Sequence, residues 1–177
     1  SAAAEEETSA QSGEESVIDA DSLSSDESSK ETLTSGDYSY TLDGDNATIT
    51  KYNGSETAVT IPDKLDGHTV TTLGSGTFAT KDMITSITIP ATVDTINSSC
   101  FYGCTVLEQV SLAEGNTAFT VTDGVLFSAN GEDLIVYPQA MEGTSYTIPD
   151  TVREIWTSAF SNTKLTDVTF PDGLLYI

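Results

Sequence analysis

An apolar skeleton recurs three times along the chain, and its middle copy runs from residue 89 to residue 112. This copy consists of Ile89, Pro90, Val93, Ile96, Phe101, Leu107, Val110 and Leu112. Copies with the same order of apolar residues run from 61 to 89, with five residues inserted, and from 148 to 170, with one residue deleted. The step from valine to phenylalanine is eight residues in every copy. A repeat of this length cannot bury its own apolar face, so the pattern predicts a solenoid in which stacked copies build the core.

Each copy ends in a run that alternates polar and apolar residues, at 86–89, 109–112 and 167–170. Alternation with period two predicts short strands that turn one face inward. Stacked in register, the strands would form a parallel sheet along one side of the solenoid. The outward positions of this sheet are candidate ligand-binding residues: Ser86, Thr88, Gln109, Ser111, Asp167 and Thr169. Opposite the sheet, the stretch around the phenylalanine of each copy predicts a tight turn or a one-turn helix.

Two segments interrupt the repeats. Residues 37–60 alternate with period two around Asp-Gly and Asn-Gly turn sequences, which predicts a three-stranded meander that caps the first coil. Residues 114–147 predict a hairpin insertion, which is either a coil with a protruding hairpin or a plain structural insertion. Insertions in repeat proteins often shape the binding face. The repeats themselves occupy about 61–88, 89–113 and 148–170.

A further repeat begins at 171–177 and stops within its first turn. Such an end leaves an open edge of apolar core, so we expect end-to-end self-association through it. The natural protein is therefore expected to be longer, or another chain is expected to cover this end.

The first 36 residues differ in composition from the rest of the chain. They hold ten acidic residues, one lysine and no aromatic residue. A segment of this kind cannot bury enough apolar area to offset the entropy of ordering, so we expect a disordered acidic tether rich in Ser and Glu, or a tail that only aids solubility. A start at Ser1 without methionine is expected either behind a removed leader or at the boundary of a fragment.

The net charge of −22 argues against two classes of partner for this chain. Residues 37–177 alone carry eighteen acidic and five basic residues. Nucleic acid and anionic lipid attract basic surfaces, so neither is an expected partner. No apolar run approaches the roughly 20 residues that span a bilayer.

The side chains used most often in catalysis, metal binding and aromatic recognition are scarce in this chain. His68 is the only histidine, so neither a zinc site nor a Ser-His-Asp arrangement is expected, and no cofactor is predicted. Cys100 and Cys104 are too few for a disulfide framework, and buried free thiols are favoured over a redox pair. Trp156 is the only tryptophan and is expected to point outward. There it would stack on a sugar ring, anchor a protein partner or lie flat over a neighbouring coil.

The motif I-P-x-x-V-x-x-I, followed by Phe and then by L-x-x-V/I-x-L/I/F, is similar to the BspA-like class of bacterial leucine-rich repeats. Cys104 stands where that class often has a cysteine. The resemblance covers about 37–177 and implies a leucine-rich repeat solenoid, a right-handed superhelix of the β-α type. It also implies a secreted or surface-attached protein of host-associated bacteria, a group that includes several adhesins. It carries no catalytic residue over to this chain.

Three functions fit these observations. The first is a non-catalytic extracellular binding module, adhesin-like, that recognises a protein or glycan through the polar ladder and the insertion. The second is a structural spacer that projects another domain, which suits a ladder of short side chains without clustered aromatic residues or arginines. The third, a polysaccharide hydrolase, is least favoured. It needs two carboxylates in different environments about 5 to 10 Å apart, and the sequence offers no such pair.

Overall fold

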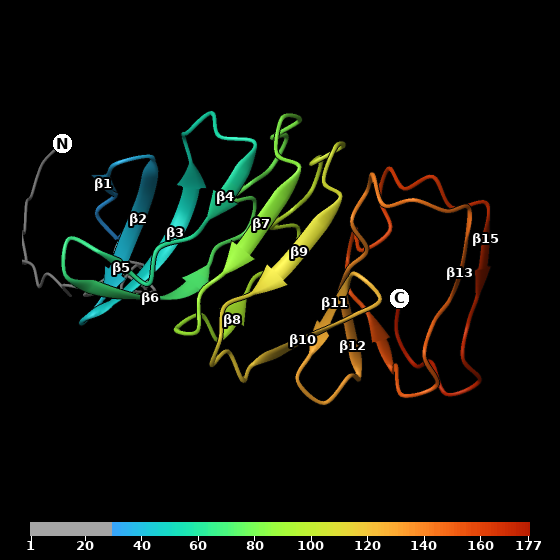
Figure 1. Cartoon of the computed structure of the whole chain (residues 1–177). Coiled ribbons are helices and arrows are strands. Elements are labelled where there is room, and N and C mark those ends of the chain that lie inside the picture. The colour runs from blue at the N-terminus through green and yellow to red at the C-terminus, as the bar shows by residue number, and fades with distance from the viewer. Residues whose placement is uncertain (1–29) are drawn as a thin grey trace, which may run out of the picture.

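A computed structural model describes residues 30–177, which form a solenoid of strands and turns (Figure 1). Most of the acidic tether predicted over 1–36 lies outside the described residues. Within 30–177 no segment is helical, so none could cross a membrane as a helix. The strands form two rows, and the inward side chains of both rows meet in the core.

The first row contains the strands that the repeat pattern predicts. Its five members are β4 (Ala58–Thr60), β7 (Ser86–Ile89), β9 (Gln109–Leu112), β13 (Ser145–Thr147) and β15 (Asp167–Thr169). β4, β7 and β9 form one parallel sheet, and β13 and β15 form another. No strand pairing joins β9 to β13 in the described part of the chain, and β10 to β12 lie between them (Figure 1). The predicted sheet is therefore split in two.

A second row that pairs from coil to coil was not expected, because the sequence analysis placed turns opposite the repeat strands and assigned the strands of 37–60 and 114–147 to a cap and a hairpin insertion. Its first sheet contains β1 (Leu33–Ser35), β2 (Tyr38–Asp43), β3 (Asn46–Tyr52), β5 (Lys64–Leu65), β6 (His68–Leu73) and β8 (Thr95–Ile96). Its second sheet contains β10 (Phe119–Thr122), β11 (Val125–Ser128), β12 (Asp133–Val136) and β14 (Glu154–Ile155). β3, β6 and β8 pair in parallel from coil to coil, as do β12 and β14. Across residues 30–177 this row is also broken, because β8 and β12 do not pair.

The N-terminal cap differs from the predicted meander in both its first and its last strand. Antiparallel β1, β2 and β3 form the cap, so it begins ahead of residue 37. The physical reason is Leu33, whose side chain packs against the core, while β1 pairs along β2. The strand predicted to end the meander, β4, instead pairs with β7 and starts the first row.

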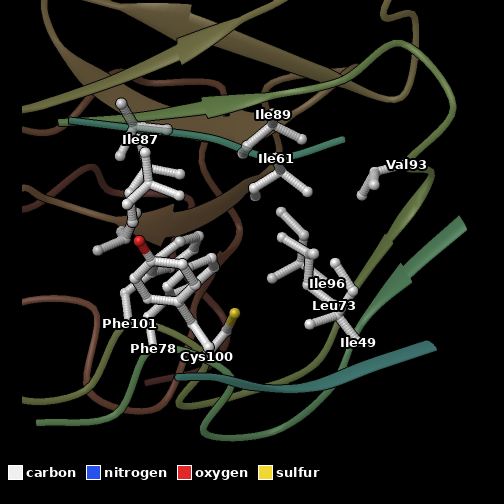
Figure 2. Close-up of a cluster of buried hydrophobic side chains, with 14 of the residues drawn as sticks. Ile49, Ile61, Leu73, Phe78, Ile87, Ile89, Val93, Ile96, Cys100 and Phe101 are labelled. Atoms are coloured by element: carbon white, nitrogen blue, oxygen red, sulfur yellow. The ribbon is translucent and has the colours of Figure 1, made fainter. Parts of the chain in front are cut away.

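Equivalent residues of successive coils stack to form the core. Figure 2 shows Ile49, Leu73 and Ile96 of the second row gathered on one side, with Ile87 and Ile89 of β7 on the other. Each of these side chains is at most 4% exposed. Burying one such side chain contributes about 1.5 to 3 kcal/mol, so the stacking of coils rather than any single coil stabilises the fold.

Two separate clusters of buried residues make up this core, and each contains its own aromatic column. The first column contains Tyr38, Tyr52, Phe78 and Phe101, with ring centroids 5.3 to 6.0 Å apart. The second contains Tyr137, Tyr146 and Phe160. Buried Gln139 links the two halves, because its Nε2 donates to the Phe101 carbonyl at 3.2 Å. The solenoid thus has two halves that meet where both rows are broken.

The return segments around the phenylalanines are turns, and the one-turn helices that the sequence allowed are not confirmed. In each return, the residue two before the phenylalanine and the residue two after it have positive φ. These pairs are Gly76 and Thr80, Ser99 and Gly103, and Ser158 and Asn162. A right-handed helical turn requires negative φ at every residue, so left-handed positions on both sides of the phenylalanine prevent it. The β-α form of the superhelix is not confirmed for the same reason.

Candidate functional site

A groove beside Trp156 lies where the two halves of the solenoid meet. It has a volume of about 210 Å³ and is lined by Ile96, Asn97, Ser98, Glu154, Trp156 and Thr157. The first three residues lie at the end of β8 and just after it, and the last three lie in β14 and just after it. The groove therefore joins two coils that are not neighbours in the repeat order.

The coil between them, here termed the recessed coil, contributes no residue to the lining of the groove. Main-chain hydrogen bonds fix the two walls, because Asn97 N donates to Leu73 O at 2.8 Å and Trp156 N donates to Leu134 O at 3.0 Å. Ile135 of the intervening β12 is 5% exposed and lies with Trp156 along a narrow inner crevice. Trp156 is itself partly buried and packs against the first core cluster, although its coil belongs to the second half. Its indole thus covers the junction and also forms one wall of the groove.

The polar side chains of the groove are available to a ligand. Asn97, Ser98, Glu154 and Thr157 are exposed, and within residues 30–177 their side chains make no hydrogen bond to the protein. The ladder on β7 and β9 differs, because Thr88 Oγ1 and Ser111 Oγ lie 3.0 Å apart and satisfy each other. A ligand at the ladder would compete with this bond, whereas a ligand in the groove displaces only water.

Glu154 is the only charged residue among those that line the groove in the described chain. A single carboxylate lacks the second acid or nucleophile that glycoside hydrolysis needs. Among residues 30–177, no group of three or more His, Cys, Asp or Glu side chains is placed to hold a metal ion. The groove can therefore bind and orient a ligand through contact and hydrogen bonds.

The candidate residues from the sequence lie in three places rather than on one face. Ser86 faces Gln109 and Thr88 faces Ser111 across β7 and β9, which forms a first ladder patch. Asp167 and Thr169 lie on β15, apart from that patch. Trp156 follows β14 in the second row. The predicted continuous ladder is therefore wrong in this respect, because the insertion separates the two sheets of the first row.

Sequence reasoning missed several residues that share these sites. Ser145 and Thr147 of β13 lie opposite Asp167 and Thr169 and complete a second ladder patch. In the groove, Asn97 occupies the same position after its strand as Trp156 does in its own coil, which is a signal that the sequence contains. The sequence does not show that Asn97 and Trp156 line one groove, because a regular repeat would place an intervening strand between them.

The hairpin insertion borders a second depression of about 200 Å³. It is lined by Thr120, Thr122, Phe127, Gly131, Pro149 and Thr151. The Thr151 hydroxyl already donates to Gly131 O at 3.1 Å, and no ionisable residue lines the depression among the described residues. It offers fewer ligand contacts than the groove beside Trp156.

The two cysteines are buried and unbridged. Burial raises the pKa of Cys100 far above its ordinary value, and burial raises the pKa of Cys104 to about 11. The Cys104 thiol lies 3.1 Å from Phe78 O and donates to it. Protonated thiols of this kind are poor nucleophiles and metal ligands, so they act as core residues.

The comparisons with known proteins agree with the repeat pattern. The family described as BspA type leucine rich repeat region matches residues 51–130 and 136–177 in six copies. A search among curated proteins finds no match. Solved structures do match, among them a leucine rich cell surface protein from Faecalibacterium prausnitzii A2-165. It is 26% identical with a TM-score of 0.57, and the match covers 81% of this chain and 44% of that one.

Two more distant structures show the same fold. A leucine rich repeat protein of T. pallidum is 22% identical with a TM-score of 0.54, over 78% of this chain and 71% of that one. One from Eubacterium ventriosum ATCC 27560 is 18% identical with a TM-score of 0.50, over 82% of this chain and 62% of that one. The chain thus spans less than two thirds of the Eubacterium and Faecalibacterium proteins. Because the family matches most of its length, the chain belongs to the BspA type leucine-rich repeat proteins.

Proposed function

We propose that this chain is a non-catalytic binding module, adhesin-like, that recognises a protein or glycan of a host or of a neighbouring cell. The supporting observation is the groove beside Trp156. There a large aromatic side chain converges with four polar side chains that make no hydrogen bond within residues 30–177. Aromatic residues dominate recognition because they offer large rigid contact area at low entropic cost.

Action outside the cell, secreted or attached to the surface, is part of the same proposal. The Faecalibacterium relative is described as a cell surface protein. An acidic segment ahead of the N-terminal cap, as the composition of the first residues predicts, fits this setting, because a hydrophilic acidic segment can hold a module away from a surface.

A structural spacer is the alternative. It is favoured by the first ladder patch, where Thr88 and Ser111 bond to each other rather than projecting toward a partner. In this alternative the repeats only set the distance between other parts of a longer protein.

A binding screen separates the two proposals. The full chain is immobilised and tested against host matrix proteins and a glycan array, beside Trp156→Ala and a double variant with Thr88→Arg and Ser111→Arg. Loss of binding in Trp156→Ala alone supports recognition in the groove, and loss in the double variant alone places recognition on the first ladder patch. No binding by the unmodified chain contradicts the binding module and favours the spacer.

A further inference from the structure

We propose that the groove beside Trp156 binds one neutral sugar ring of a glycan, stacked on the indole. This inference rests on the proposed function and names the class of ligand for its site. It goes beyond a general protein or glycan partner, because it predicts which sugars bind and which do not.

The repeat itself does not require an aromatic residue at position 156. Equivalent main-chain hydrogen bonds occur in three coils, from Gly74 to Ile49 O at 2.8 Å, from Asn97 to Leu73 O and from Trp156 to Leu134 O. The same place in the coil thus accepts glycine, asparagine and tryptophan. At Gly74 even a Cβ would meet Ile49 O at 2.9 Å. The repeat thus accepts residues as different as glycine and tryptophan at this place, so the presence of Trp156 calls for a reason other than the repeat.

The lining of the groove matches the C–H face of a sugar ring and the hydroxyl groups around its rim. A pyranose presents a row of C–H groups that can pack on an aromatic face, and hydroxyl groups around its rim that need hydrogen-bond partners. Trp156 lines the groove, and in the proposed complex its indole supplies the aromatic face. Asn97 supplies an amide that both donates and accepts, Ser98 and Thr157 supply hydroxyls, and Glu154 supplies an acceptor.

The size and charge of the groove restrict the class of ligand further. Its volume of about 210 Å³ is below the roughly 300 Å³ at which pockets for drug-sized ligands begin, so it suits one ring with the rest of the glycan in solvent. Glu154 is its only charged lining residue within the described chain, and the chain has a net charge of −22. Both repel an acidic sugar. The expected ligand is therefore neutral.

Tryptophan fluorescence can follow binding, because Trp156 is the only tryptophan in the chain and its emission reports on the groove and on the junction beneath it. The full chain is titrated with neutral methyl glycosides and short neutral oligosaccharides, and with glucuronic acid as the charged counterpart. We expect a saturable change in tryptophan emission with at least one neutral sugar and none with glucuronic acid. Because a lost hydrogen bond costs about 1.4 kcal/mol, Asn97→Ala should raise the Kd about ten-fold.

Two further variants test the role of the Glu154 charge and the location of the binding site. Glu154→Gln retains the shape of the side chain without its charge, so it should bind the neutral sugar and lose part of the discrimination against glucuronic acid. The double variant with Thr88→Arg and Ser111→Arg should titrate like the unmodified chain. Unchanged circular dichroism shows that each variant is folded.

Several outcomes would overturn the inference. One is the absence of any emission change with neutral sugars, and another is equal affinity for glucuronic acid. An Asn97→Ala variant with unchanged Kd would also place the sugar elsewhere. If the chain still captures a matrix protein in the screen described above, the proposed function stands without the sugar site. If it captures nothing there either, both fail.

Discussion

At the scale of single residues, two Asp-Gly turns of the same type differ in what their carboxylates do. Asp66 and Asp123 both have a φ of 49° and both precede a glycine with positive φ, so each forms a two-residue hairpin turn. Asp66 accepts hydrogen bonds from the Ser35 hydroxyl at 2.7 Å and the Tyr40 hydroxyl at 2.8 Å. The Ser35 bond first and the Tyr40 bond second lower the pKa of Asp66. No such bond to the Asp123 carboxylate occurs within residues 30–177.

Asp66→Asn should therefore destabilise the N-terminal cap, while Asp123→Asn, which preserves an equivalent turn, should leave stability unchanged. The pKa of Asp66 is lowered in the folded state, so its contribution is present above the unfolded pKa of about 3.9 and is lost as pH falls through the folded value. Urea unfolding at pH 7 and at pH 3 tests this. The two variants should differ at pH 7, and the difference should shrink as pH falls below the unfolded pKa. Equal midpoints at pH 7 would show that the Ser35 and Tyr40 bonds contribute nothing.

The buried thiols have the opposite dependence on pH. Raised pKa values keep Cys100 and Cys104 protonated in the folded state, whereas both ionise in the unfolded chain above about pH 9. Their contribution is present below the unfolded pKa and is lost as pH rises. At pH 10 the free energy of unfolding should be lower by about 1.4 kcal/mol for each thiol, and in a double Cys→Ala variant it should fall less steeply as pH rises.

In the native protein at pH 8, thiol reagents should react with Cys100 and Cys104 only as fast as the core opens. Rapid labelling would contradict the burial of both groups.

At the scale of elements, the returns show how a close approach between coils decides which residue fits. Gly103 has a φ of 76°, and a Cβ there would lie 3.3 Å from both N and Cα of Thr80 in the preceding coil. Gly44 has a φ of 60°, and among the described residues no heavy atom beyond its two chain neighbours lies within 4 Å of the corresponding Cβ. The two glycines thus share a left-handed conformation, and only one of them contacts a neighbouring coil.

Gly103→Ala should cost about 2 kcal/mol or more, and Gly44→Ala about 1 kcal/mol. The difference measures the contact with Thr80, because the conformational penalty is common to both variants. Thermal unfolding should detect it as a lower Tm for Gly103→Ala, by about 2 to 4 °C for each kcal/mol. Similar Tm values for the two variants would mean that the Thr80 turn moves aside at little cost.

The sequence predicted the elements that carry a strong periodic signal. The strands at 86–89, 109–112 and 167–169 alternate polar and apolar residues over three or four positions, and their order and inward side chains follow from that pattern. β8 and β14 contain two residues each, too few to show any period, so the second row could not be foreseen. Trp156 could be singled out because it is unique, but its groove depends on a recessed coil. That coil lies at the break in both rows, and no local sequence preference predicts the break.

At the scale of the whole molecule, the C-terminal end presents the main apolar surface of the described chain. Phe170 and Leu175 are 52% and 67% exposed, and Tyr176 and Ile177 are 65% and 86% exposed. β15 beside them pairs only with β13, so it is an edge strand. Exposed apolar side chains next to an unpaired edge favour contact with another chain. The net charge of −22 opposes any contact between two copies.

These two effects predict self-association that depends on salt. Salt screens the repulsion, with a Debye length of about 30 Å at 0.01 M and about 10 Å at 0.1 M, but it leaves the apolar attraction in place. In sedimentation experiments the average mass should therefore rise with protein concentration, and more steeply at higher salt. A double variant with Leu175→Lys and Ile177→Lys should remain monomeric under the same conditions. Met83→Lys, which adds a charge at an exposed apolar residue away from this end, should associate like the unmodified chain. A chain that stays monomeric at every salt concentration would show that charge repulsion outweighs the apolar end, and association that survives the double variant would place the contact elsewhere.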